Sequence, residues 1–182
     1  MAARFLVEAN MNKFIFLDID GPVIPTGCYF INRNASFDRT FSNVCVGFVK
    51  KLLDLSGAKL VTNSMHNYHR RTDTAGEHLG DLRSDLVKAG IPAESFHNIW
   101  RTEFGHNLFP TNSWRADQPH PRLRAINEWL SKWGGDNHEW IGFDDEPYKH
   151  ENQFIVDFDH GITHAQFVQA CEKWKLRIPI IL

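Results

Sequence analysis

The stretch from Phe14 to Gly21 constrains the fold more than any other part of this sequence. It reads Phe-Ile-Phe-Leu-Asp-Ile-Asp-Gly, so an apolar run leads into two carboxylates and a glycine. Such a run is typical of a strand buried on both faces of a parallel sheet, whose carboxyl end is where α/β folds bind ligands. Asp18 and Asp20 alternate with Ile19 and therefore share one side of an extended chain, and the glycine permits a sharp turn. The stretch predicts a paired-carboxylate site; the alternative is a surface turn that happens to carry two aspartates.

Length and composition limit the class of protein. The chain has 182 residues and a formal net charge of −2, which predicts one domain over residues 1–182 and no global basic field for nucleic acid. Its three cysteines are far apart and show neither disulfide nor metal spacing, which favours a reducing compartment. Residues 1–12 lack the apolar core of a signal peptide, and no apolar stretch approaches membrane-spanning length. We therefore expect a cytoplasmic protein with no membrane partner.

Strand and helix patterns alternate along the chain. The predicted strands cover residues 14–17, 59–61, 96–100, 140–143 and 154–156, and the predicted helices cover residues 43–56, 76–90, 123–133 and 163–176. In the first helix, Val44, Phe48, Leu52 and Leu55 recur at helical spacing and predict its buried stripe. Strand–helix–strand units of this length predict parallel crossovers. The fold class is therefore α/β, a Rossmann-like three-layer α/β/α sandwich with a mainly parallel central sheet.

Two longer segments are candidates for covering the site. Residues 22–42 follow the carboxylates directly and are rich in proline, glycine and aromatic residues, which favours a flap, although a plain surface loop has the same composition. Residues 65–120 contain a second set of polar and loop-like stretches. The sequence shows no large independent cap domain, so we expect these segments to form a minimal cap.

Polar residues follow three of the predicted strands. They are Asp18 and Asp20, Thr62 and Asn63, and Asp144 and Asp145. Right-handed crossovers would bring these groups to one edge of a parallel sheet. Four carboxylates at one edge repel one another and raise each other's pKa, which a hard divalent cation relieves. An oxygen-rich site with open positions suits Mg²⁺.

This set of groups suits phosphoryl transfer. One carboxylate can attack phosphorus, and the other can protonate the leaving oxygen and later deprotonate water. A hydroxyl and a backbone N–H at the second strand end can hold phosphate oxygens.

The motifs resemble those of the haloacid dehalogenase superfamily. Asp18-Ile19-Asp20-Gly21 is similar to its first motif, Val61-Thr62 to its second and the stretch Trp140 to Asp145 to its fourth, in matching order across residues 13–146. Residues 154–174, with Gly161-Ile162-Thr163 before a final helix, resemble the tail of the small members associated with "Swiss Army knife" RNA-repair proteins.

The resemblance implies a role for each matching residue. Asp18 would be the nucleophile and a metal ligand, and Asp20 the general acid and base, with its backbone carbonyl as a further ligand. Thr62 and the backbone of Asn63 would bind the phosphoryl group. Asp144 would complete the Mg²⁺ shell, with Asp145 beside it.

The third motif departs from the family pattern. The family has a lysine or arginine near the start of the helix before the fourth motif, and no lysine stands there. Arg122 and Arg124 are the candidates, since Lys132 comes too late in the helix. Arg122 lies nearer the helix start and is the predicted phosphate-binding cation; the alternative is an ordinary solvated arginine.

The sequence therefore predicts a Mg²⁺-dependent phosphomonoester hydrolase, a phosphatase that acts through an aspartyl-phosphate. Its partner would be a phosphorylated substrate, either a small molecule such as a nucleotide or a nucleic-acid end. One alternative is a phospho-receiver or phosphate-binding module without turnover, which would not need Asp20. The other is a metal-dependent nuclease that uses the same carboxylates without a covalent intermediate.

Overall fold

The computed structural model describes residues 11–31, 40–67, 71–72, 78–104 and 119–178. Five strands form one sheet in the order β5-β2-β1-β6-β7, and every neighbouring pair is parallel. The strands are β1 (Asn12–Leu17), β2 (Lys59–Thr62), β5 (Phe96–Arg101), β6 (His138–Asp144) and β7 (Gln153–Ile155). The predicted parallel α/β fold is thus confirmed. Within the described ranges, no helix is long and apolar enough to cross a membrane.

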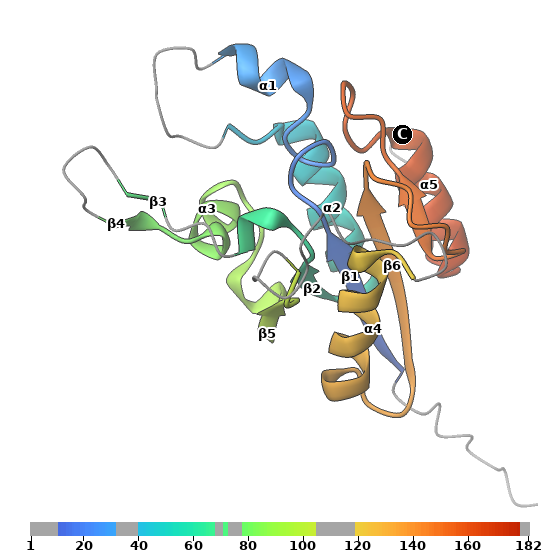
Figure 1. Cartoon of the computed structure of the whole chain (residues 1–182). Helices are drawn as coiled ribbons and strands as arrows, with labels where there is room; N and C mark the ends of the chain where they lie inside the picture. Colours follow the sequence, from blue (N-terminus) through green and yellow to red (C-terminus); the bar gives the residue numbers. More distant parts are fainter. Residues whose placement is uncertain (1–10, 32–39, 68–70, 73–77, 105–118, 179–182) are drawn as a thin grey trace, which may run out of the picture.

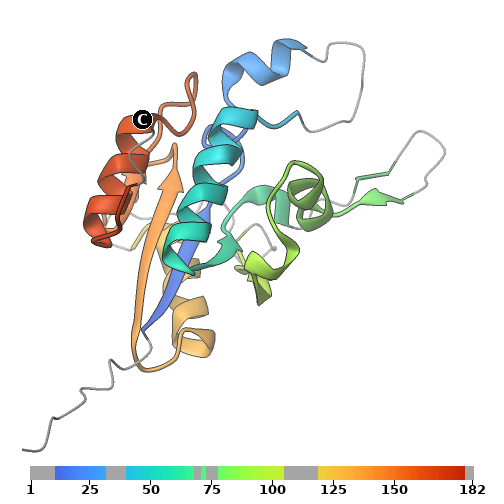
Figure 2. The same cartoon turned by 180° about the vertical axis from the view of Figure 1, so that it is seen from behind.

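Helices cover both faces of this sheet (Figures 1 and 2). On one face lies α4 (Pro121–Trp133), whose Ile126 and Trp129 pack with Phe14 and Phe16 of β1. The other face carries α2 (Asn43–Ser56), α3 (Leu82–Lys88) and α5 (His164–Lys173), which share a second apolar cluster with the alternate side chains of β1. The strand β1 is therefore buried on both faces, as its continuous apolar run predicts.

The boundaries of α2 follow from its end residues. The Ser42 side chain accepts the N–H of Cys45 at the start, and Gly57 ends the helix in the left-handed conformation with φ 67°. The predicted buried stripe was partly wrong, because Val44 is 66% exposed. The buried side is instead formed by Cys45, Val46, Val49, Leu52 and Leu53.

The segment predicted as a helix over residues 76–90 contains two elements. His78–Gly80 forms the strand β4, which pairs antiparallel with β3 (Arg71–Thr72), and residues 73–77 lie outside the described residues. The helix α3 begins after Asp81, whose side chain accepts the N–H of Ser84. Leucine spacing alone could not locate this start, because the cap depends on a single aspartate.

The two predicted cover segments differ in what the structure shows of them. In the first, α1 (Thr26–Ile31) projects beyond the carboxyl edge of the sheet (Figure 1), and residues 32–39 lie outside the described residues. In the second, α3 and β5 belong to the apolar core and the main sheet. The short helix η1 (Met65–Asn67) and the pair β3–β4 lie outside that sheet, and residues 68–70 and 105–118 are not described.

The strand order places a switch in direction beside β1. From β1 the chain crosses to β2 and β5 on one side, then returns to β6 and β7 on the other. At such a switch point, the loops beyond two adjacent strands diverge and leave a crevice, which is where α/β sheets bind ligands. The carboxyl ends of β1 and β6 carry Asp18 and Asp144.

Candidate active site

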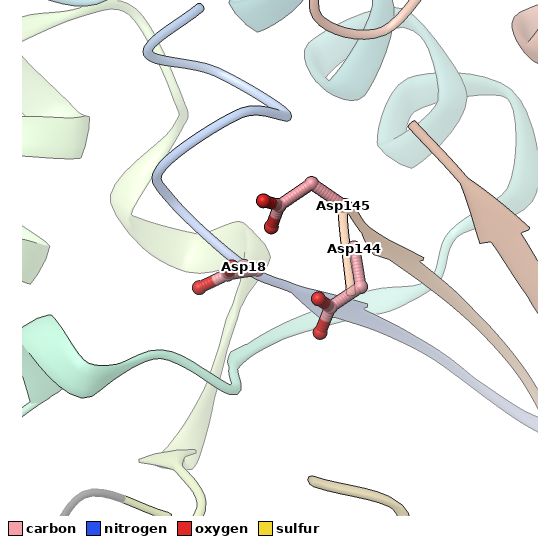
Figure 3. Close-up of side chains that lie close together, drawn as sticks. All are labelled: Asp18, Asp144 and Asp145. Atoms are coloured by element: carbon pink, nitrogen blue, oxygen red, sulfur yellow. The ribbon is translucent and has the colours of Figure 1, made fainter. Parts of the chain in front are cut away.

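Three carboxylates meet at the switch point between β1 and β6. Asp18 follows β1, and its backbone N–H donates to the carbonyl oxygen of Phe143 at 3.0 Å. This register sets Asp18 beside Asp144, the last residue of β6, and Asp145. One carboxylate oxygen from each of the three aspartates lies within 4.8 Å of the others, and their side chains gather around one space (Figure 3).

Arg122 supplies the positive charge of this site. It stands in the first turn of α4, which His120 caps by accepting the Arg122 N–H and in which Pro121 takes the first position. Its Nη1 lies 3.0 Å from Asp18 Oδ2 and 3.1 Å from Asp144 Oδ2, and its Nε lies 2.9 Å from Glu146 Oε2. Although burial alone disfavours the charged guanidinium, these carboxylates raise the pKa of Arg122 above its ordinary value. Of the predicted alternatives, Arg124 is exposed and pairs with Glu128 instead.

One guanidinium does not neutralise the three carboxylates. Burial, followed by the charge of Asp18, raises the pKa of Asp144 to about 8. The same two causes raise the pKa of Asp145 to about 6. Arg122 opposes both shifts without cancelling them. Carboxylate oxygens this close, with ionisation this costly, fit a hard divalent cation, because the cation would favour the charged form of each.

Asp20 has a separate environment, although it stands only two residues from Asp18. Asp18 is 2% exposed, whereas the side chain of Asp20 is 39% exposed. The Tyr29 hydroxyl donates to Asp20 Oδ1 at 2.6 Å, and His66 Nε2 lies 2.8 Å from Asp20 Oδ2. Partial burial raises the pKa of Asp20, but the hydrogen bonds of His66 and Tyr29 outweigh it and hold the pKa below its usual value. Of the four predicted metal residues, the structure thus brings three carboxylates together, and the Asp20 carboxylate lies outside that group.

The predicted phosphate ligands Thr62 and Asn63 make hydrogen bonds within the protein at the end of β2. The Thr62 side chain is fully buried, and its hydroxyl donates to Asn67 Oδ1 at 2.6 Å. The Asn63 N–H donates to the Leu17 carbonyl at 2.8 Å, so it is already occupied. The Asn63 carbonyl accepts Arg122 Nη1 at 3.0 Å, which makes Asn63 a support for the arginine. Both residues lie at the predicted strand end, and their binding of a phosphoryl group stays a prediction.

Gly21 is required where the chain turns away from the site. Its φ is 81°, which side-chain-bearing residues rarely adopt. A Cβ at this position would lie 2.9 Å from the Cβ of Asp145 and 3.3 Å from Cδ2 of Phe158. The glycine therefore lets the turn after β1 pass directly against one of the three clustered aspartates.

Sequence reasoning missed three residues of the site: Tyr29, His66 and Glu146. The histidine lies in the polar stretch after the second predicted strand, which has no periodicity from which a contact could be inferred. The tyrosine lies within the predicted flap, which has no periodicity from which a contact could be inferred. Glu146 directly follows the fourth motif, and its position beside two aspartates was the available signal.

Comparisons with known proteins identify the family of this chain. No curated protein and no solved structure matches this chain. A family model described as the HAD domain in Swiss Army Knife RNA repair proteins matches residues 14–167, from the start of the β1 apolar run to the middle of α5. That range holds all the carboxylates of the site and Arg122, and membership implies a phosphatase-type hydrolase. The chain therefore belongs to the family of HAD domains found in Swiss Army Knife RNA repair proteins.

Proposed function

We propose that this protein is a Mg²⁺-dependent phosphomonoester hydrolase that acts through an aspartyl-phosphate on Asp18. The observation that carries the proposal is the unequal setting of the two motif carboxylates. Asp18 is buried against Arg122 and two further aspartates, whereas Asp20 is partly exposed and lies within hydrogen-bond distance of Tyr29 and His66 of the cover. Asp18 thus has the buried setting of a nucleophile held beside cationic groups, and Asp20 has the more accessible setting that proton exchange with a leaving group or water requires.

The reaction divides into two displacements at phosphorus. In the first, a carboxylate oxygen of Asp18 forms a bond to phosphorus while the bond to the leaving oxygen breaks, and that oxygen takes a proton from Asp20. In the second, Asp20 takes a proton from water, whose oxygen attacks phosphorus. The bond to Asp18 then breaks, and inorganic phosphate leaves with both aspartates restored.

Asp18, Asp144 and Asp145 would hold the cation, whose charge would offset that of the phosphoryl oxygens. Arg122 lies against Asp18, so its charge acts where the phosphoryl group is transferred. Its Nη1 contacts both the Asp18 and the Asp144 carboxylate, so its positive charge reduces the repulsion between them. The side chain is itself fixed by Glu146 and by the face of Phe104, 4.7 Å from its guanidinium carbon.

The proposed substrate is a nucleotide or a nucleic-acid end. The description of the matched family concerns RNA repair, which supports a phosphorylated polynucleotide end. Among the described residues, the only helix of the first cover segment is the six-residue α1. The sequence shows no large independent cap domain, which supports a bulky substrate, whereas small-metabolite enzymes commonly close a lid. The three cysteines are all buried and free, which supports the proposed cytoplasmic location.

A substrate screen tests this proposal. It would compare small phosphomonoesters, 5′- and 3′-phosphorylated oligonucleotides and phosphodiesters, each with Mg²⁺ and with a chelator. We expect Mg²⁺-dependent phosphate release that Asp18→Asn abolishes and Asp136→Asn, a matched change of an exposed aspartate, preserves. Cleavage of diesters without release from monoesters would indicate a nuclease instead. A stable phosphoprotein without turnover would indicate a receiver.

A further inference from the structure

We propose that Tyr29 and His66 are positioning residues that hold Asp20 for proton transfer, each from a separately anchored part of the cover. The inference rests on the proposed function of Asp20 and adds how that group is oriented. Asp20 is bonded on both carboxylate oxygens by residues 9 and 46 positions away. A side chain that is 39% exposed on a turn would otherwise sample several rotamers.

The two contacts restrict the orientation of the Asp20 carboxylate without occupying all of its hydrogen-bond acceptor positions. The Tyr29 hydroxyl takes one acceptor position on Oδ1, and the His66 imidazole lies at Oδ2. A carboxylate offers about four acceptor positions, so each oxygen keeps one for the leaving group or for water. The pair therefore fixes the plane of the carboxylate and still leaves it able to transfer a proton.

Tyr29 is held in place by the loop that follows β7. The N–H of Thr26, at the start of α1, donates to the Phe158 carbonyl at 3.0 Å. The rings of Tyr29 and Phe158 stack with centroids 6.2 Å apart and planes 11° apart. Phe158 also borders Gly21, in the turn that carries Asp20. The hydroxyl of Tyr29 is thus placed by backbone and ring contacts that do not involve Asp20.

His66 is held in place by a buried polar network under η1. Asn67 donates from Nδ2 to the carbonyls of Thr62 and Thr102, both at 3.2 Å, and accepts the Thr62 hydroxyl on Oδ1. All three residues are buried. The His66 N–H donates to Ser64 Oγ at 3.3 Å. Thr62, predicted as a phosphate ligand, therefore anchors the short helix that presents His66 to Asp20.

Correct placement of Asp20 matters most when the leaving group is a strong base. An alkoxide must receive a proton as its bond to phosphorus breaks, whereas p-nitrophenolate leaves readily without one. If Asp20 lost its orientation, the hydrolysis of alkyl phosphates should therefore slow much more than that of p-nitrophenyl phosphate. A general loss of folding or of metal binding would slow both substrates alike.

The test measures leaving-group release in a single turnover, with Mg²⁺, for an alkyl phosphate and for p-nitrophenyl phosphate. We expect Tyr29→Phe and His66→Phe each to slow the alkyl phosphate about tenfold and p-nitrophenyl phosphate no more than about twofold, as partial loss of a proton-transfer contribution of 10²- to 10⁴-fold. His66→Gln keeps a donor at a similar reach and should recover most of the alkyl rate. Phe30→Leu, at the next position of α1, should leave the ratio of the two rates unchanged.

Tyr29→Phe removes one oxygen from a side chain that is 50% exposed, so folding is not at stake in this variant. Equal slowing of both substrates, or no slowing of either, would overturn the inference while leaving the proposed function intact. The alkyl phosphates tested would include a 5′-phosphorylated oligonucleotide. A wild-type protein that releases phosphate from none of these esters would overturn the proposed function, and the inference with it.

Discussion

At the scale of single residues, Arg122 joins the site together. Its Nη1 contacts both Asp18 and Asp144 and also the Asn63 carbonyl, so one side chain links the ends of β1, β2 and β6 to α4. A lysine at this position could not make these contacts together with the one to Glu146. The arginine therefore fits a site in which four groups must be bonded at once.

We expect Arg122→Ala to lower the free energy of unfolding by about 3 kcal/mol, because it leaves two buried carboxylates without their partner. Hydrolysis should fall by about two orders of magnitude or more. Arg122→Lys should retain part of the stability and part of the hydrolytic activity. Arg124→Ala removes an exposed pair with Glu128 and should change stability by less than about 1 kcal/mol. Urea denaturation and steady-state kinetics measure the effects; equal losses in the Arg122 and Arg124 alanine variants would contradict the assignment.

Asp144 should make the metal-free protein less stable as the pH rises. Its pKa is about 8 in the folded chain against an ordinary value of 3.8, so between these values the folded state binds the proton that the unfolded state has lost. The free energy of unfolding in chelator should therefore fall between pH 5 and pH 8. Asp144→Asn should flatten this fall and be about 1 to 2 kcal/mol more stable than wild type at pH 8.

Denaturation in urea at the two pH values, with chelator present, measures this difference. Asp136→Asn is the control, since the exposed Asp136 should leave the slope as in wild type. If Asp144→Asn proved less stable than wild type at pH 8, the inferred cost of ionising Asp144 beside the other two aspartates would be wrong.

At the scale of elements, prediction succeeded where a local signal fixed the outcome. The bounds of α2 follow from Ser42 and Gly57, and the acidic strand ends follow from apolar runs that stop at aspartates. The contacts of Tyr29 and His66 could not be predicted in this way. They depend on where α1 and η1 lie beyond the carboxyl edge of the sheet, and those positions are set by distant partners such as Phe158 and Thr102. The direction of the Thr62 hydroxyl depends on the same packing.

The turn after β1 provides a prediction at this scale. Gly21→Ala would place a Cβ 2.9 Å from the Cβ of Asp145 at a φ of 81°, so we expect a loss of about 1 to 3 kcal/mol in stability and a displaced Asp145. Mg²⁺ should then bind at least about tenfold more weakly, as calorimetric titration would show. Gly27→Ala is the matched control, because a Cβ there has no neighbour within 4 Å. It should bind Mg²⁺ as wild type does, and a similar loss in both variants would refute the steric account.

At the scale of the whole molecule, the strand order explains why the site is where it is. The central strand β1 pairs with β2 on one side and with β6 on the other, so its carboxyl end lies where the loops beyond neighbouring strands diverge. Core residues on both faces fix the register of β1 and β6, which sets Asp18 against Asp144. The apolar core thus positions groups whose mutual repulsion would otherwise separate them. The cover segments then add Tyr29 and His66 from outside this rigid frame.

The covalent intermediate is the central claim, and a rapid acid quench tests it most directly. The protein would be mixed with a substrate labelled in its phosphoryl group, in Mg²⁺, and then quenched and digested for mass spectrometry. We predict that label appears on Asp18 before phosphate is released. With p-nitrophenyl phosphate, whose leaving oxygen needs no proton, we predict that the label accumulates in Asp20→Asn, which cannot activate water for the second displacement. Phosphate release by the wild type with no label on Asp18 at any time, or label that persists in Asp18→Asn, would contradict the account.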